Sequence, residues 1–330
     1  IDEACTAGVR THYQVTNACR GCLARPCLMN CPRQAIAMVD GQARIDPAKC
    51  VNCGLCQKAC PYHAIIYMPI PCEEACPVDA ISKDELGLEV IDPEKCIACG
   101  KCVQSCPFGA IMEKSQLVDV IQAFRAGRPV IAMVAPSIVG QFPGTWPQLV
   151  TAIQQAGFCG VREVALGADQ AAVEEAREWR ERIEGGEPFM TTSCCPAFTA
   201  AVDKHVPGLA CRVSHTRSPM HYTAGQTASE NPEAVRVFIG PCMAKRREAL
   251  ADPLVDYVLT FEELGALLIA RDIDVARCDE APPSSSPASR AGREFPISGG
   301  VTAAIQEAVG EDARLRPFLV DGLEDRKSVV

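Results

Sequence analysis

The hydrophobic pattern of the chain changes near residue 115. Before this point the sequence is a series of short segments between cysteines, and after it cysteine becomes sparse and apolar residues recur with helical spacing. Residues 116–126 carry such a pattern, and it ends at Gly127, the residue type that most often follows a helix. The next apolar run, PVIAMVAPSI, predicts a strand, with a new helix beginning at Pro136-Ser137.

Strands and helices alternate through the rest of the chain. The predicted strand-containing segments are 161–183, 187–198, 234–242 and 256–270. The first and last of them continue into helices, and the last helix carries a capping box made by Thr260 and Glu263. The segments 187–198 and 234–242 are expected to be strands that run into loops. This alternation predicts a mostly parallel sheet flanked by helices, and the Pro- and Ser-rich segment 281–292 predicts a surface loop.

Cysteine provides the strongest chemical signal, with 21 among 330 residues. One run has the spacing C-x2-C-x4-C-x3-C-P and two have C-x2-C-x2-C-x3-C-P. These runs are Cys19, Cys22, Cys27 and Cys31; Cys50, Cys53, Cys56 and Cys60; and Cys96, Cys99, Cys102 and Cys106. This spacing is typical of [4Fe–4S] clusters, in which one loop provides three thiolates and the fourth cysteine ligates the partner cluster.

Pairing the runs predicts three accessory clusters. Their ligand sets are Cys19, Cys22, Cys27 and Cys60; Cys50, Cys53, Cys56 and Cys31; and Cys96, Cys99, Cys102 and Cys76. The third set takes its fourth ligand from a shortened run that retains only Cys72 and Cys76. Cys72 and Cys106 would then provide only half of the ligands of a further cluster. A nested pairing remains an alternative. Zinc sites prefer ligands in two pairs, and disulfide frameworks suit small secreted domains, so neither explains runs that end in proline.

An internal repeat supports this division. CPRQAI, CPYHAI, CPVDAI and CPFGAI each end a unit, as in tandem bacterial ferredoxin units. We therefore expect a two-cluster domain over 1–68, a second and partly degenerate cluster domain over 69–115, and an α/β domain over 116–330. The fold class is thus α+β ferredoxin-like domains followed by an α/β domain.

Bulk composition narrows the class of protein further. The net charge is −9 and the sequence has no basic stripe, which argues against a nucleic-acid partner. No apolar run is long enough to span a membrane, and the first residues do not resemble a signal peptide. We expect a soluble protein of a reducing, anaerobic cytoplasm.

Several potential ligands fit no run. The isolated cysteines are Cys5, Cys159, Cys211 and Cys278, and we expect them to be buried, unreactive thiols. The histidines are His12, His63, His205, His215 and His221. They show no ligand spacing, and the sequence assigns them no role.

Three motifs behind the cysteine-rich region together resemble the [FeFe]-hydrogenases, in particular the monomeric group with tandem ferredoxin units. The motifs are TSCCPAF, PCMAKRRE and SGGVTAAI, in that order. The resemblance implies an H-cluster, a [4Fe–4S] cube joined to a two-iron unit with CO, cyanide and a dithiolate bridge. It also implies reversible formation of H2 from protons and electrons, a ferredoxin-type electron carrier, and maturation proteins for the diiron site.

The resemblance also implies roles for individual residues. Cys195 and Cys242 would be ligands of the cube, and Cys194 would remain free of metal and pass protons to the open iron. An ordinary thiol pKa near about 8.5 would allow that exchange. Lys245 would donate a hydrogen bond to a cyanide, and Glu248 would hold the loop.

A proton path to the buried iron is implied as well. In the family a cysteine, a serine and two glutamates form it, and here Ser214, Glu175 and Glu178 stand at the matching positions. The two glutamates are three residues apart and share a helix face, and Arg182 is placed to steady the outer end. The alternative is an ordinary solvated helix face.

The match departs from the family in three respects. The family takes two further cube cysteines from a Gly-rich C-terminal segment, and none follows Cys278 here, so we expect the sequence to be truncated. Phe198 stands where Trp is common and Gly240 where Met is common, although neither change removes a ligand. The alternatives are an electron-transfer polyferredoxin without catalysis, a hydrogen-sensing relative, and the eukaryotic iron–sulfur-assembly relative, which the presence of Cys194 disfavours.

Overall fold

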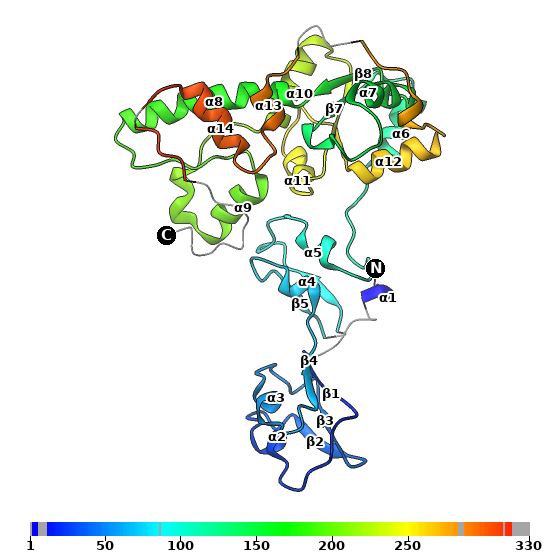
Figure 1. Cartoon of the computed structure of the whole chain (residues 1–330), viewed down its shortest axis with the longest axis vertical. Coiled ribbons are helices and arrows are strands. Elements are labelled where there is room, and N and C mark those ends of the chain that lie inside the picture. Colours follow the sequence, from blue (N-terminus) through cyan, green and yellow to red (C-terminus); the bar gives the residue numbers. More distant parts are fainter. Residues whose placement is uncertain (1, 6–11, 86, 283–286, 313, 319–330) are drawn as a thin grey trace. The chain divides into compact units, whose positions relative to one another are not determined.

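The computed structural model describes residues 2–5, 12–85, 87–282, 287–312 and 314–318 (Figure 1). Two compact units can be distinguished. The first comprises 1–96 and 101–112, and the second comprises 97–100 and 113–330. The three-domain division expected from the sequence remains a prediction. No helix in the described part of the chain is long and apolar enough to cross a membrane.

The first unit consists of very short elements. They are α1 (Asp2–Cys5), β1 (Tyr13–Val15), α2 (Pro26–Met29), β2 (Ile36–Val39), β3 (Gln42–Ile45), α3 (Leu55–Ala59), β4 (Ile65–Tyr67), α4 (Pro71–Glu74), β5 (Ile81–Lys83), β6 (Glu89–Ile91) and α5 (Lys101–Ser105). The strands form three antiparallel pairs, β1 with β4, β2 with β3 and β5 with β6. Elements of three to five residues cannot bury a large core, and cysteines make up much of the small one that forms.

The sequence repeat corresponds to a repeated loop. In each of the four repeats the third residue after the last cysteine has a positive φ. These residues are Gln34 (50°), His63 (50°), Asp79 (49°) and Gly109 (60°). The backbone N–H of the next residue, an alanine each time, then donates to the sulfur of that cysteine. The N···S distances are 3.2 Å at Cys31, 3.4 Å at Cys60, 3.2 Å at Cys76 and 3.4 Å at Cys106.

A four-stranded parallel sheet organises the second unit. Its strands are β7 (Val130–Val134), β8 (Gly160–Glu163), β9 (Val235–Ile239) and β10 (Tyr257–Leu259), in the order β10-β9-β7-β8. Every residue of β7 is buried, as expected for a central strand covered on both faces. The sheet confirms the predicted parallel α/β arrangement.

Helices connect and cover these strands. They are α6 (Leu117–Arg125), α7 (Trp146–Gln155), α8 (Ala165–Glu184), α9 (Pro196–His205), α10 (Pro219–Glu230), α11 (Ala244–Leu250), α12 (Phe261–Ala270), α13 (Arg290–Glu294) and α14 (Gly300–Val309), with 3₁₀ turns at Pro136–Ile138, Pro207–Arg212 and Val275–Arg277. The long α8 packs against α10 and α14 (Figure 1). A Cβ atom on Gly167 would lie 2.2 Å from the carbonyl oxygen of Pro219, so glycine is what allows α8 and α10 to approach this closely.

The predicted elements were mostly found. The strands at β7 to β10 and the helices α6, α8 and α12 are confirmed, and the Thr260–Glu263 capping box forms in both directions. The prediction of a strand in 187–198 was wrong. Only one bridge forms there, between Thr191 and Val213, because Pro188 lacks an N–H and Pro196 begins α9.

Two smaller expectations also need correction. The helix start at Pro136-Ser137 is a single 3₁₀ turn, Pro136–Ile138. The loop expected over 281–292 ends earlier, since Ser289 caps α13 by accepting a hydrogen bond from the N–H of Gly292. Part of that loop, 283–286, lies outside the described residues.

Candidate functional site

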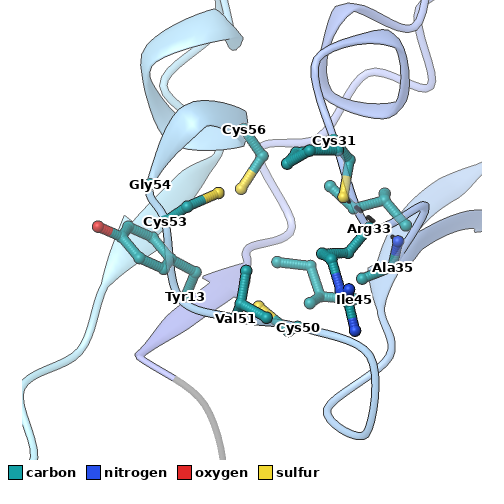
Figure 2. A pocket seen from close by; sticks show the side chains of 12 residues that line it. Tyr13, Cys31, Arg33, Ala35, Ile45, Cys50, Val51, Cys53, Gly54 and Cys56 are labelled. Atoms are coloured by element: carbon teal, nitrogen blue, oxygen red, sulfur yellow. Dashed lines mark hydrogen bonds between the residues drawn. The ribbon is translucent and has the colours of Figure 1, made fainter.

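The first unit brings two of the predicted ligand sets around separate pockets. Cys31, Cys50, Cys53 and Cys56 line one of them, and Figure 2 shows their sulfur atoms directed toward a common space. Tyr13, Ile36 and Ile45 complete much of its wall. The helix α3 carries Cys56, and the repeated loop described above orients Cys31.

The second pocket is built in the same way. Cys19, Cys22, Cys27 and Cys60 line it, together with Val15, Ala43 and Ile65. The short helix α2 carries Cys27, and burial is the main cause that raises the pKa of this thiol. The donor set in each pocket is four thiols in apolar surroundings, and this suits a [4Fe–4S] cube.

The structure brings the third ligand set together only in part. Cys76 and Cys102 pack around a small cluster formed by Ile70, Cys72 and Ile81. Cys99 lies in 97–100, which groups with the second unit, so the third set stays a prediction. Burial, and after it the charge of Glu89, raises the pKa of Cys72 to about 11 and keeps this thiol protonated.

Cys106 differs from Cys72 in its environment. Partial burial raises its pKa, but the backbone N–H groups of residues 108–111 outweigh this effect, and the net pKa is lowered. The loop of Cys106 has the same hydrogen bond as the loops of the other three repeats. The sequence did not decide whether Cys106 is a cluster ligand. Among the described residues, no three Cys, His, Asp or Glu side chains are arranged for a single metal ion. A cube differs in this respect, because each of its irons takes its own thiolate.

The candidate site of the second unit gathers around Cys194 and Cys195, in the loop before α9. Cys194 packs against a buried cluster formed by Ala168 and Ala172 of α8, Phe295 and Ala304 of α14. Burial, followed by the charge of Glu175, raises the pKa of Cys194 to about 12. The expectation of an ordinary thiol pKa was therefore wrong, and Cys194 stays protonated near neutral pH. Cys195 is exposed.

The loop between β9 and α11 supplies the next two groups. Burial raises the pKa of Cys242, and the nearby charge of Lys245 opposes the rise. The helix α9, which begins after Cys195, packs against α11, which follows Cys242, so the loops that carry the two thiols lie together. Lys245 Nζ lies 3.4 Å from the carbonyl oxygen of Cys194. The chain thus brings two thiols, a third protonated thiol and a cation to one location.

Lys245 is fixed and is not a solvated surface charge. Its side chain is 11 % exposed, and its Nζ lies 2.6 Å from Glu248 Oε2. The hydroxyl of Ser218, at the start of α10, donates to the other oxygen of Glu248. Glu248 and the hydroxyl of Ser218 therefore hold the ammonium group of Lys245 against the loop that contains Cys194.

Glu175 is the most deeply buried acidic group of the site, with 1 % of its surface exposed. It lies on α8, and its Oε1 accepts a hydrogen bond of 3.3 Å from the backbone N–H of Ser193. Burial raises the pKa of Glu175 to about 7. The N–H of Ser193 is the largest opposing effect, followed by a smaller rise from the charge of Glu178 and a smaller lowering by the hydroxyl of Ser214. This carboxyl can therefore exchange a proton near neutral pH.

Glu178 lies one helical turn further along α8 and behaves in the opposite way. Its carboxylate accepts hydrogen bonds from Ser214 Oγ (2.6 Å), from the N–H of His215 (2.9 Å) and from Thr216 Oγ1 (3.0 Å), and Arg182 forms an ion pair with it at 2.6 Å. Partial burial raises the pKa of Glu178, but these donors outweigh it and lower the pKa to about 2. The helix face that carries both glutamates is therefore not a solvated surface.

Sequence reasoning missed several groups that surround these residues. Ser193, Thr216 and Ser218 each hold a site residue by a hydrogen bond, and a motif search offers no signal for such contacts. His215 was assigned no role, yet its Nδ1 lies 3.2 Å from Glu178 Oε1. Among the isolated cysteines, only Cys278 is buried as expected. Cys5 is partly buried, and Cys159 and Cys211 are exposed.

The cysteine pockets of the first unit and the parallel α/β fold of the second define the class of iron–sulfur redox proteins. The family described as "Iron only hydrogenase large subunit, C-terminal domain" matches residues 128–322, more than half of the chain, and the chain belongs to this family. A "4Fe-4S dicluster domain" matches 18–64 and a "4Fe-4S binding domain" matches 89–112. The N-terminal region therefore binds [4Fe–4S] clusters.

Curated relatives agree with the family assignment. The chain is 32 % identical over 309 residues to iron hydrogenase 1 of Clostridium pasteurianum, covering 84 % of this chain and 53 % of that protein. It is 29 % identical over 280 residues to the periplasmic [Fe] hydrogenase large subunit of Nitratidesulfovibrio vulgaris, covering 78 % and 65 %. A solved [FeFe]-hydrogenase, HydA(deltaEFG), is 29 % identical, with a TM-score of 0.49 over 57 % of this chain and 56 % of that one. The chain thus spans about half to two thirds of these curated relatives.

Proposed function

We propose that this chain carries the accessory clusters and part of the active site of an [FeFe]-hydrogenase, which interconverts H2 with protons and electrons. The observation that carries the proposal is the meeting of Cys194, Cys195, Cys242 and Lys245 beside the buried Glu175, inside the region that matches the hydrogenase family. Either cysteine motif alone would allow other iron–sulfur functions.

The residues present fit part of the H-cluster ligand set. Cys195 and Cys242 come from the loops before α9 and α11, which pack against each other, and would be two thiolate ligands of its cube. Bound there, the H-cluster would supply the metal chemistry that cleaves or forms H2. The side chain of Lys245 is mostly buried, and a fixed cation there offsets negative charge more strongly than it would in water.

Lys245 needs a defined position to act on a cyanide ligand. Glu248 and Ser218 supply this position, because the ion pair and the hydroxyl restrict the rotamers of the lysine side chain. Because the ion pair with Glu248 uses one of the three N–H donors of the ammonium group, two donors remain for other acceptors. One of them is directed to the carbonyl oxygen of Cys194.

We propose that protons reach Cys194 along Glu178, Ser214 and Glu175. Cys194 has a raised pKa and holds its proton as a thiol, ready to give it up to a stronger base. Glu175 can reload it, because burial brings its pKa to about 7. Ser214 is hydrogen-bonded to Glu178, and its hydroxyl can accept and donate a proton in one step. The order of these groups supports a path from the surface to Cys194.

The accessory clusters would pass electrons between this site and an external carrier of the ferredoxin type. The support is the pair of four-cysteine pockets in the first unit, whose ligand sets alternate between two runs of the sequence. We also propose that proteins which assemble diiron sites act on the full-length protein. The three domains over 1–68, 69–115 and 116–330, and a cytoplasmic location, belong to this proposal.

Infrared spectroscopy of the matured, full-length protein tests the proposal. Bands of metal-bound CO and cyanide are expected, together with H2 production when a reduced ferredoxin is supplied. A protein with accessory iron but without such bands would be an electron-transfer polyferredoxin, and the proposal would be wrong. Bands without turnover would indicate a hydrogen sensor.

A further inference from the structure

His215 lies at the surface beside the carboxylate that forms the outer end of the proposed proton path. Its side chain is 85 % exposed, whereas that of Glu178 is 14 % exposed. The ring Nδ1 is 3.2 Å from Glu178 Oε1 and 3.0 Å from Arg182 Nη2. One ring nitrogen thus contacts a carboxylate and a guanidinium that are mostly buried, while most of the ring meets solvent.

Both protonation states of this nitrogen have a partner. With a hydrogen, Nδ1 can donate to Glu178, and without one it can accept from the guanidinium of Arg182, which is always a donor. The backbone N–H of His215 also donates to both oxygens of Glu178, at 2.9 and 3.0 Å, and this keeps the ring near the carboxylate. A proton can therefore leave or reach Nδ1 without breaking up the site.

Besides Glu178, the charged group that contacts His215 is Arg182. Its guanidinium stays charged, and it is held by the carbonyl oxygens of Cys211 (2.8 Å) and Val213 (3.0 Å). Beyond Arg182 lie Glu187, which is 3.4 Å from Arg182, and Arg212, which pairs with Glu187 at 3.1 Å. Imidazole is the side-chain type that ordinarily gains and loses protons between about pH 5 and 8.

We propose that His215 is the residue through which protons enter and leave the path to Cys194. This inference rests on the proposed hydrogenase function. A proton from solvent binds Nε2, and the Nδ1 proton passes to Glu178 Oε1. The products are a neutral ring that carries its hydrogen on Nε2 and a protonated Glu178, and the charge is balanced without any electron transfer. Protonated Glu178 is short-lived, because its pKa is lowered to about 2, and it passes the proton on along the path. The freed Nδ1 lone pair then accepts from Arg182, and proton release runs in reverse.

One test needs no bound H-cluster. At a fixed pH, NMR of the ring nitrogens reports how the hydrogen of His215 is shared between Nδ1 and Nε2 in the wild-type chain and in Glu178→Gln. The variant should move the hydrogen away from Nδ1, because the charged acceptor 3.2 Å from this nitrogen is lost, and the ring of His205, at the end of α9, should not change. An unchanged distribution at His215 would mean that ring and carboxylate are not coupled, and the inference would be wrong.

The second test uses the matured, full-length enzyme. In dilute buffer, His215→Ala and His215→Gln should lower turnover about tenfold, less than the roughly 10²- to 10⁴-fold of a direct proton donor, because water still reaches Glu178. Added imidazole buffer should restore it, and His205→Ala should behave as wild type. A loss that imidazole does not restore would indicate a structural role, and no loss would exclude the role in proton exchange.

The two proposals can fail separately. If the wild type neither shows CO and cyanide bands nor makes H2, the hydrogenase function fails and this inference fails with it. If the wild type is active and His215→Ala matches it in dilute buffer, only the inference about His215 is overturned.

Discussion

The two units position their reactive groups by different means. In the first unit one loop supplies three cysteines of each pocket, such as Cys50, Cys53 and Cys56, and a single distant residue, Cys31, completes the set. In the second unit Cys195 and Cys242 come from loops before α9 and α11, and Glu175 comes from α8. A short loop is thus enough to arrange the first kind of site, whereas the second kind depends on the packing of the whole unit.

Burial of polar groups separates the units as well. By whole-residue exposure, every buried polar or charged residue of the described chain lies in the second unit, among them Glu175, Arg182, Ser214 and Ser218 of the candidate site. Each such group costs stability unless it is hydrogen-bonded, and these groups are bonded mainly to one another and to nearby backbone. The first unit carries thiols in apolar pockets, while the second has a connected polar network.

The strongest test of this difference is the substitution Cys194→Ala. We expect turnover of the matured protein to fall by at least about 10²-fold, because a positioned proton donor is lost. Iron bound to the first unit should not change, since its pockets are formed by other loops. Loss of accessory iron in this variant, measured by iron analysis and EPR, would show that the two units do not form their sites independently.

The reciprocal test is Cys53→Ala. The pocket of Cys31, Cys50, Cys53 and Cys56 should lose its cluster, a loss of about four irons per chain. Iron analysis and EPR measure the effect, and Cys159→Ala, at an exposed thiol outside the runs, is the matched control. An unaltered iron content and EPR spectrum would refute the ligand assignment of Cys53.

The buried network of the second unit predicts opposite pH effects for its two glutamates. Glu178→Gln should lower the free energy of unfolding at pH 7 by roughly 2 to 3 kcal/mol, because hydrogen bonds to a charged group are lost. The pKa of Glu178 is lowered to about 2, so its stabilising contribution is present above about pH 4.5 and disappears as the pH falls toward 2. The penalty of the variant should shrink in that direction.

Glu175→Gln provides the contrasting variant. The pKa of Glu175 is raised from 4.5 to about 7, so between these values the folded state binds more protons than the unfolded state, and wild-type stability falls as the pH rises. Relative to wild type, the variant should therefore gain stability from pH 4.5 to 8, by up to about 3 kcal/mol. Denaturant unfolding at several pH values measures this trend, and parallel curves for the variant and wild type would contradict the buried carboxyl.

The smallest expected effect is that of a helix cap. Thr260→Ala removes the cap of α12 and should cost about 1 kcal/mol in the free energy of unfolding, with no change in iron content. Thr145→Ala, at the equivalent capping box of α7, should cost about the same. A loss of iron from the first unit in either variant would contradict the separation of the two units.

Local signals predicted much of the fold. The strands β7 to β10 and the helix α12 were visible because hydrophobic periodicity and capping are properties of neighbouring residues. The strand expected near Thr191 failed because its pairing is limited to one residue by its own prolines and by the start of α9. The sequence did not suggest α13, because the Pro- and Ser-rich composition concealed the cap at Ser289.

For this protein, the sequence alone determined the cluster spacing, the parallel sheet and the family motifs, because each is written in residues a few positions apart. Only the tertiary structure decided which carboxyl is protonated, which lysine is fixed and which histidine meets the proton path. Glu175 and Glu178 are one helical turn apart and identical in type, yet burial raises the pKa of the first and hydrogen bonds lower that of the second. Such differences arise from segments distant in the chain, since desolvation and hydrogen bonding depend on what packs around a group.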